Sequence, residues 1–319
     1  MNKTITVAET AAWLKERDNF LILMHRRPDG DTVGCAGALT GALRELGKNA
    51  YVLRNPEITP RYSPYVDDCW APDDYVPEHI IAVDTASYSL FPKNSEEFAV
   101  ELCIDHHPSN TFYAQNTCLI EAAASCGEVV YEILVSMAGA ISAKSAERLY
   151  VAITTDTGCF MFGNTTADTL RVASLLIEAG APHRKLNKLL FRTKTRSRTI
   201  IESMIYSRLE FYYGGAVAIS TITRDMMESA NADEDDLDDI ASLPGSIEGV
   251  LAGITLREIT SESDCKVSVR TSQNVDAYAI SAHFGGGGHK FASGFTIGKT
   301  IPEVREELLD TLKEFFPQE

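Results

Sequence analysis

The segment Leu21-Ile22-Leu23-Met24-His25-Arg26-Arg27-Pro28-Asp29-Gly30-Asp31 decides the fold of this chain. Residues 20–25 are almost entirely apolar, which predicts a strand buried on both faces, as in a parallel sheet. This strand ends at His25, and a turn through Pro28 and Gly30 then carries Asp29 and Asp31. A helix should follow over 32–47, where small and apolar residues recur at helical spacing and stop at a glycine. In open α/β sheets the functional crevice lies beyond the carboxyl ends of the strands, where these polar side chains are expected.

The same pattern of an apolar segment followed by Asp or His recurs three times. Residues 80–84 end in Asp84, residues 100–104 lead into Asp105-His106-His107, and residues 149–153 lead to Asp156. Asp-Gly-Asp alone is also ordinary turn chemistry, but four such segments together favour a shared site. Imidazole and carboxylate are ligands suited to Mn²⁺ or Mg²⁺ rather than to a thiolate-bound metal.

These motifs resemble those of the DHH phosphoesterases. The resemblance is closer still to the NrnA-like DHH/DHHA1 subfamily of oligoribonucleases and phosphoadenosine-phosphate (pAp) phosphatases, and it covers nearly the whole chain. The matching motifs, in chain order, are residues 25–31, Asp84, Asp105-His106-His107, Asp156 and Gly285-Gly286-Gly287-Gly288-His289.

The resemblance implies two divalent cations, with Mn²⁺ the preferred ion and Mg²⁺ the alternative. One cation would be held by His25, Asp29 and Asp84, and the other by Asp31, Asp84, His106 and Asp156, so that Asp84 bridges them. Neighbouring side chains at a strand end should point apart. We therefore expect His107 to contact phosphate oxygens or to protonate the leaving alkoxide rather than to share the metal of His106. Asp105 is expected to orient a metal-bound histidine.

The fold class is α/β, in two domains joined by a linker. We predict a DHH domain over 1–183 with a mainly parallel sheet, a basic helical linker over 184–209, and a smaller α/β DHHA1 domain over 210–319. By resemblance, the metal chemistry belongs to the first domain and substrate binding to the second, with the active site between them.

Four consecutive glycines, Gly285 to Gly288, carry a heavy entropic penalty. Such a run is best explained where the backbone approaches a ligand closely and its N–H groups can bind an anion, with His289 completing the site. Arg257 and Arg270 lie on predicted strands and are candidate phosphate contacts, because guanidinium groups bind phosphate bidentately. A structural ion pair is the alternative for either arginine.

The formal charge of −16 argues against binding of long nucleic acid over the whole surface. A short RNA or a nucleotide in a local pocket remains compatible with it. The stretch from Ala179 to Ile201 holds seven Lys or Arg residues and no acid. It is either a solvated linker helix or a basic wall that attracts nucleotide phosphates.

With 319 residues, of which 45 % are hydrophobic and 23 % charged, the composition is that of a globular protein. The sequence has no apolar run of about 18 residues, so no membrane segment is expected. Seven cysteines without a Cys-x-x-Cys pair indicate a reducing cytoplasm. A homodimer is left open.

The preferred function is metal-dependent hydrolysis of phosphoester bonds in oligoribonucleotides of a few residues, in 3′,5′-bisphosphate nucleotides such as pAp, or in both. Two alternatives remain: a phosphodiesterase of pApA or cyclic-dinucleotide turnover, and a catalytically silent nucleotide-binding module. The sequence does not decide between pAp, pApA and short RNA, or between attack from the 5′ and the 3′ end.

Overall fold

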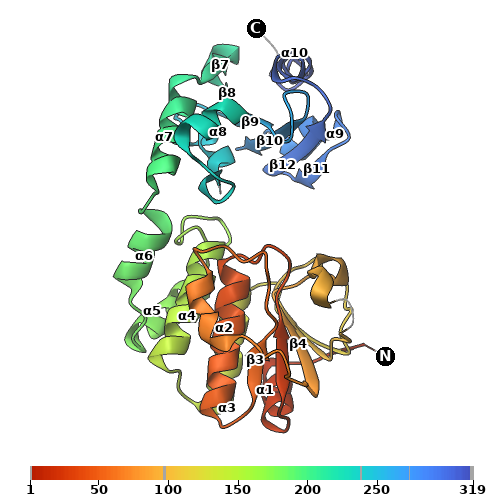
Figure 1. Ribbon diagram of the computed structural model, residues 1–319, viewed down its shortest axis with the longest axis vertical. Coiled ribbons are helices and arrows are strands. Elements are labelled where there is room, and N and C mark those ends of the chain that lie inside the picture. The colour runs from red at the N-terminus through yellow and green to blue at the C-terminus, as the bar shows by residue number, and fades with distance from the viewer. Residues whose placement is uncertain (1, 96–97, 238, 273, 317–319) are drawn as a thin grey trace. The chain divides into compact units, whose positions relative to one another are not determined.

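The computed structural model describes residues 2–95, 98–237, 239–272 and 274–316 (Figure 1). The chain divides into two compact units, Met1–Thr193 and Lys194–Glu319. Among the described residues, no helix is both long and apolar enough to cross a membrane.

The N-terminal unit is built on a six-stranded sheet in which every strand pair is parallel. Its strand order is β1-β6-β5-β4-β2-β3. The predicted parallel sheet is therefore confirmed. Strand β6, which lies between β1 and β5, was not predicted, because its partly polar sequence lacks the apolar run of a buried strand. The strands are β1 (Lys3–Thr4), β2 (Phe20–Leu23), β3 (Ala50–Val52), β4 (His79–Val83), β5 (Leu102–Asp105) and β6 (Asn116–Leu119).

Among the described residues, the α-helices cover one face of this sheet. Alternate strand residues such as Ile22, Ile81 and Ile104 pack in a core with α2, α3 and α4. The opposite strand residues, including Leu23 and Ala82, pack instead against side chains from non-helical segments such as Phe91. The helices are α1 (Val7–Lys15), α2 (Gly30–Glu45), α3 (Cys126–Ala138), α4 (Ala143–Asp156), α5 (Ala167–Glu178) and α6 (His183–Phe191).

Close packing of α2 on α4 brings two distant parts of the sequence together (Figure 1). A Cβ atom at Gly34 would lie 2.4 Å from the carbonyl oxygen of Arg148, and one at Gly30 would lie 2.4 Å from Thr155. Glycine is thus required where the two helices touch. The contact at Gly30 places the start of α2 beside the end of α4, and both ends carry predicted metal ligands.

The C-terminal unit contains a mixed six-stranded sheet of order β11-β12-β10-β9-β8-β7. Among the strands described, the β8–β9 pair is parallel and the other pairs are antiparallel. The strands are β7 (Glu210–Tyr212), β8 (Val217–Ile222), β9 (Ala252–Glu258), β10 (Cys265–Thr271), β11 (Gly287–His289) and β12 (Ala292–Ile297), and the helices are α7 (Arg196–Ser207), α8 (Arg224–Ala230), α9 (Ala277–Ala282) and α10 (Ile301–Leu312).

One face of this sheet packs on α9 and α10 and the other, at β8, packs on α7 and α8. From the sequence we also expect a helix near 235–242. This expectation is wrong, because the described residues there form only short 3₁₀ turns at Asp235–Leu237 and Ile240–Ser242. The run of acids in this region does not offer the apolar spacing of a longer helix.

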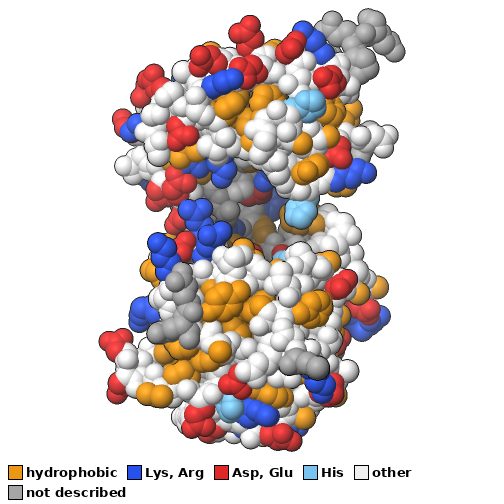
Figure 2. Space-filling model, turned by 90° about the vertical axis from the view of Figure 1, so that its right-hand side faces the viewer, with side chains coloured by type: hydrophobic (Ala, Val, Ile, Leu, Met, Phe, Trp, Pro, Cys, Tyr) orange, Lys and Arg blue, Asp and Glu red, His pale blue; other side chains and the backbone are white. Residues whose placement is uncertain are grey.

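The stretch from Ala179 to Ile201, which is rich in Lys and Arg, contains α6 and the start of α7 as two separate helices. Helix α6 belongs to the N-terminal unit and α7 to the C-terminal unit. The boundary between the two units falls between Thr193 and Lys194. Two of the cations in this stretch already have structural partners, because Lys194 and Arg198 both pair with the buried carboxylate of Glu202. On the face seen in Figure 2, acidic and basic side chains are interspersed over each unit.

Candidate functional site

The six predicted metal ligands lie together at the carboxyl edge of the N-terminal sheet. They form two groups that could each hold a metal ion, His25 with Asp29 and Asp84, and Asp31 with His106 and Asp156. A third group joins Asp84 to His106 and His107. Within each group the candidate ligand atoms lie within 4.8 Å of one another. Asp84 thus lies within reach of both halves of the cluster.

Asp84 has one carboxylate oxygen fixed and the other free. It follows β4 in a left-handed conformation, with φ of +51°, and its side chain is 3 % exposed. Its Oδ2 accepts a hydrogen bond of 2.7 Å from the Thr32 hydroxyl. Its buried Oδ1 has no hydrogen-bond partner. A buried oxygen without a partner is unfavourable unless a cation or another ligand completes it.

His106 presents a second unpartnered atom to the same space. Its Nδ1 donates to the carbonyl oxygen of Ala123 at 3.2 Å, which leaves Nε2 as the lone-pair nitrogen. Nε2 is buried without a partner and lies 3.6 Å from Asp84 Oδ1, 3.7 Å from Asp156 Oδ2 and 3.8 Å from Asp31 Oδ2. A lone pair facing three carboxylates fits a bound cation.

Asp31 is positioned by the start of α3. Its two carboxylate oxygens accept the backbone N–H groups of Cys126 at 2.7 Å and Gly127 at 2.9 Å. The carboxylate thereby satisfies N–H groups that a helix leaves unpaired. The capping box that the spacing of Ser125 and Glu128 suggests does not form, since the Ser125 hydroxyl makes no cap bond. Asp31, distant in sequence, takes that place.

His25 and Asp29 complete the other half of the cluster. Asp29 is the N-cap of α2, and its Oδ1 accepts from the N–H groups of Asp31 and Thr32. The ring of His25 donates from Nδ1 to the carbonyl oxygen of Arg26 at 2.7 Å. Its Nε2 then faces Asp84 Oδ2 at 3.9 Å and Asp29 Oδ1 at 4.0 Å.

Without a cation, the crowded carboxylates hold their protons more tightly. Burial, followed by the charges of neighbouring acids, raises the pKa of Asp31 and of Asp84 well above the usual value. Burial and the charge of Asp29 raise the pKa of Asp156 to about 6. Burial lowers the pKa of His106, which keeps that ring neutral as a metal ligand must be. The donor set of imidazole and carboxylate fits a divalent cation.

The expectation that His106 and His107 point apart is wrong. Their ring centroids are only 4.4 Å apart, because both residues lie beyond the end of β5, where strand alternation no longer holds. Both backbone N–H groups turn onto Asp105 Oδ1, at 2.8 Å for His106 and 3.3 Å for His107.

Asp105 orients His107 rather than the ring of His106. Its Oδ1 accepts from Nδ1 of His107 at 2.8 Å, and its Oδ2 accepts from Asn110 at 2.6 Å. Burial raises the pKa of Asp105, but the hydrogen bonds from His107 and Asn110 outweigh it and the net pKa is lowered. The same bond to Asp105 raises the pKa of His107. His107 is therefore the residue of the pair suited to carry a proton.

The supporting groups that sequence reasoning missed include the Thr32 hydroxyl, the Ala123 carbonyl oxygen and the Asn110 amide. Thr32 had a signal, because it stands three residues after the N-cap Asp29, in the first turn of α2. The other two lie in loops, and only the folded chain brings them to the ligands.

The predicted substrate-binding residues of the C-terminal unit do not all come together. The sheet register pairs Arg270 with Ala292, and Ala292 with His289, so Arg270 and His289 lie in one row on one face. Arg257 pairs with Lys266, four residues along β10 from Arg270, which is about 13 Å. Arg257 also forms an ion pair with Glu234. The geometry favours the structural alternative for Arg257.

The glycine run is partly a strand, and its members differ in what they require. A Cβ at Gly286 would lie 2.5 Å from the carbonyl oxygen of Gly294, and one at Gly288 would lie 2.6 Å from that of Ala292. Gly285 has a φ of +72°. These three are explained by the hairpin itself. Gly287 has an ordinary φ and open space around it, so nothing in the fold requires glycine there.

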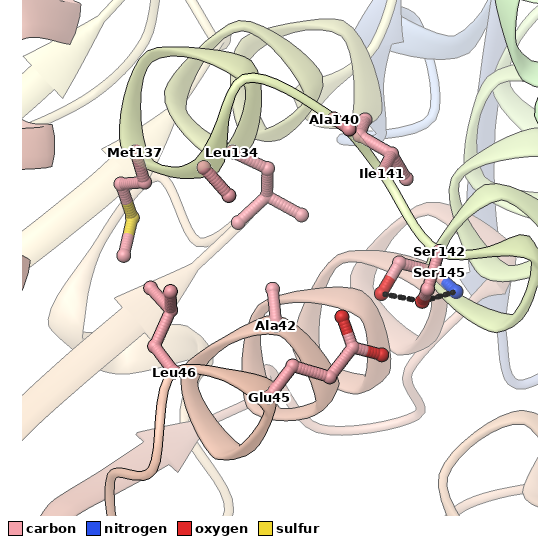
Figure 3. A pocket seen from close by; sticks show the side chains of 10 residues that line it. Ala42, Glu45, Leu46, Leu134, Met137, Ala140, Ile141, Ser142 and Ser145 are labelled. Atoms are coloured by element: carbon pink, nitrogen blue, oxygen red, sulfur yellow. Dashed lines mark hydrogen bonds between the residues drawn. The ribbon is translucent and has the colours of Figure 1, made fainter.

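A separate pocket lies away from the ligand cluster (Figure 3). It is lined by Ala42 in the last turn of α2 and by Leu46 just after that helix, with Leu134, Met137 and Ile141. The metal ligands lie at the opposite, N-terminal end of α2. This pocket therefore belongs to a different part of the unit.

Comparison with known proteins identifies the family. The family model described as "DHH family, N-terminal domain" matches residues 19–153, and the model described as "DHHA1 domain" matches residues 214–318. A protein from Thermus thermophilus, named bifunctional oligoribonuclease and PAP phosphatase NrnA, is 31 % identical over 92 % of this chain and 89 % of its own. The chain belongs to the DHH/DHHA1 family. The protein of the same name from Bacillus subtilis is 28 % identical over 88 % of this chain and 90 % of its own.

A solved structure supports the fold of this DHH/DHHA1 protein. The crystal structure of an exopolyphosphatase-related protein from Bacteroides fragilis has a TM-score of 0.86 at 23 % identity, and it covers 98 % of this chain and 97 % of its own. The acids and histidines of this chain's DHH domain are groups that could hold metal.

Proposed function

We propose that this chain hydrolyses phosphoester bonds in short nucleotides, namely oligoribonucleotides of a few residues, 3′,5′-bisphosphate nucleotides such as pAp, or both. The observation that carries the proposal is the pair of buried, unpartnered atoms Asp84 Oδ1 and His106 Nε2, 3.6 Å apart within a ring of carboxylates. The names of the NrnA relatives supply the substrate class.

Two divalent cations fit the donor set, with Mn²⁺ the preferred ion. His25, Asp29 and Asp84 would hold one, and Asp31, Asp84, His106 and Asp156 the other. When bound, such cations supply positive charge to phosphoryl oxygens and acidify a water molecule. The carbonyl oxygens of Arg26 and Ala123 accept from the two histidine ligands, and the Cys126 N–H and the Thr32 hydroxyl donate to the carboxylates. These hydrogen bonds fix the ligands in advance, so that little reorganisation is needed.

His107 carries the proton for the leaving group. Asp105 accepts a hydrogen bond from its Nδ1 and raises its pKa, which favours the protonated form of the ring. The side chain is 41 % exposed, so its Nε2 can meet a substrate oxygen. Donation from Nε2 to the departing alkoxide would leave a neutral imidazole still held by Asp105.

The C-terminal unit is proposed to bind substrate through one face of its sheet. Arg270 and His289 lie in one row, and Gly287 stands beside them without a packing reason. A guanidinium, an imidazole and a bare strand backbone suit a phosphate group. We assign Arg257 no substrate contact, since Glu234 occupies it.

A catalytically silent nucleotide-binding module is not favoured. Every ligand position is filled, and the side chains converge. We further propose a cytoplasmic location, because all seven cysteines are free thiols. A homodimer stays a prediction.

The test is the initial rate of hydrolysis against substrate length, with Mn²⁺ present and with the concentration of ends and the salt held fixed. We expect pAp or RNAs of about two to five nucleotides to be hydrolysed faster per end than a 24-mer, because a long strand would run over a surface of net charge −16. A rate that stays flat or rises to the 24-mer would reject the short-substrate reading. Absence of turnover on every length would reject hydrolysis itself.

A further inference from the structure

The loop that follows the metal ligand Asp156 exposes two large apolar side chains in succession. Met161 is 77 % exposed and Phe162 is 55 % exposed. The preceding Phe160 points the other way, into the core, where its ring packs edge-on against Tyr150 at 6.2 Å. Core packing therefore explains Phe160 but not its two neighbours.

The backbone of this loop is held in a conformation that side chains disfavour. Cys159 and Phe160 both adopt positive φ values, +56° and +68°. Hydrogen bonds enforce the turn: the N–H of Cys159 donates to Thr154 O at 2.7 Å, and that of Phe162 to Thr157 O at 3.0 Å. Backbone strain of this kind is concentrated at functional sites. Here it turns Met161 and Phe162 outward.

The loop is also tied to the backbone that carries the metal ligands. The amide of Asn164 donates to Asp156 O at 3.1 Å and to Ala124 O at 3.0 Å. The neighbouring Ala123 carbonyl oxygen is the group that orients His106. The position of the exposed pair is thus fixed relative to two of the ligands.

The ring of Phe162 is supported on one side only. It lies against Gly158, where a Cβ atom would come within 2.5 Å of the ring. Gly158 is two residues beyond Asp156, so the ring is held near the ligand cluster while more than half of the side chain faces solvent. An aromatic ring packed on backbone and otherwise open is suited to stacking on another flat group.

We propose that Phe162, with Met161 beside it, is the platform on which a nucleobase of the substrate stacks. The proposal rests on the proposed function, which supplies a nucleotide to the same site. The acids and histidines of the cluster can address only the phosphate and its metal ions. A base needs an apolar flat surface, and stacking accepts any base because every base has a π-face.

The experiment compares pAp with a base-free analogue, the methyl riboside 3,5-bisphosphate, in wild type, Phe162→Ala, Phe162→Trp and Phe211→Ala. Phe211 is the matched control, since it is 52 % exposed and lies on β7 of the other unit. We expect Phe162→Ala to raise KM for pAp about tenfold or more, to leave KM for the base-free analogue unchanged, and Phe162→Trp to restore KM for pAp. Phe211→Ala should change neither value.

The dissociation constant of AMP, measured by calorimetry on the same four proteins, separates the two proposals. If wild type hydrolyses neither these compounds nor RNAs of two to five nucleotides, the proposed function fails, while weaker AMP binding by Phe162→Ala alone would still support the platform. An equal rise in KM for both compounds, or no change in KM for pAp and in AMP binding, would overturn the platform.

Discussion

The ligand cluster of the N-terminal unit and the glycine hairpin of the C-terminal unit are both dense motifs, yet the fold explains them to different degrees. In the cluster, hydrogen bonds fix one atom of Asp84 and of His106 and leave the other buried and unpartnered. In the hairpin, strand packing or positive φ accounts for Gly285, Gly286 and Gly288, and only Gly287 is unexplained. A residue that the fold does not require is the better candidate for a ligand contact.

The largest effect is expected when the unpartnered carboxylate oxygen of Asp84 is replaced. Asp84→Asn keeps the size of the side chain, and we expect it to lower turnover by a factor of about 100 or more, since contacts made through a metal are worth several kcal/mol. Mn²⁺ should raise the melting temperature of wild type much more than that of the variant. Retention of more than about a tenth of the wild-type rate at saturating Mn²⁺ would contradict the bridging role.

In the metal-free chain, removing the charge of Asp84 should not lower the thermal stability. Burial and repulsion raise its pKa, so the ionised carboxylate destabilises the fold at neutral pH. The metal-free Asp84→Asn variant should therefore unfold at an equal or higher temperature than metal-free wild type. A lower temperature would mean that Asp84 is a structural group.

The two neighbouring histidines offer a second test within the cluster. His106→Ala should lose bound metal, because its Nε2 is the unpartnered atom that faces three carboxylates. His107→Ala should keep its metal and lower kcat by a factor of about 100, within the range for loss of general acid catalysis. Elemental analysis and kcat decide between them. Equal metal loss in both variants would place His107 among the ligands, a reading that its 3.7 Å distance from Asp84 also allows.

The sequence predicted the inner strands β2, β4 and β5 and the clustering of the candidate ligands, because the same short segments determine both. A buried parallel strand reads as an apolar run, and its end is where a ligand such as Asp84 must stand. The direction of side chains beyond the strand ends could not be predicted from the sequence. The close approach of the His106 and His107 rings, and the capping of α3 by Asp31, depend on contacts between distant segments. Pairing register likewise separates Arg257 from Arg270, although both read as strand arginines.

The hairpin can be tested with two alanine substitutions in adjacent positions. Gly286→Ala should destabilise the C-terminal unit by about 1–3 kcal/mol, because the added Cβ overlaps Gly294 and Phe295. Gly287→Ala should leave the free energy of unfolding within about 0.5 kcal/mol of wild type and should raise KM. Denaturant unfolding and steady-state kinetics measure both effects. An unchanged KM for Gly287→Ala would leave the glycine run with a purely structural role.

The smallest expected effect distinguishes the two strand arginines. Arg270 lies in the row of His289 and, among the described residues, pairs with no acid, whereas Arg257 is engaged by Glu234. Arg270→Ala should raise KM for short substrates about tenfold, the loss of a charge-assisted hydrogen bond. Arg257→Ala should change KM by less than about twofold, because an exposed partner such as Glu234 gains little from the pair.

Both variants should keep the wild-type metal content, since neither residue is a ligand. Initial rates against substrate concentration at fixed salt give the two KM values. Equal rises in KM would mean that the substrate spans both rows of the sheet, and the separation by register would then have no bearing on binding.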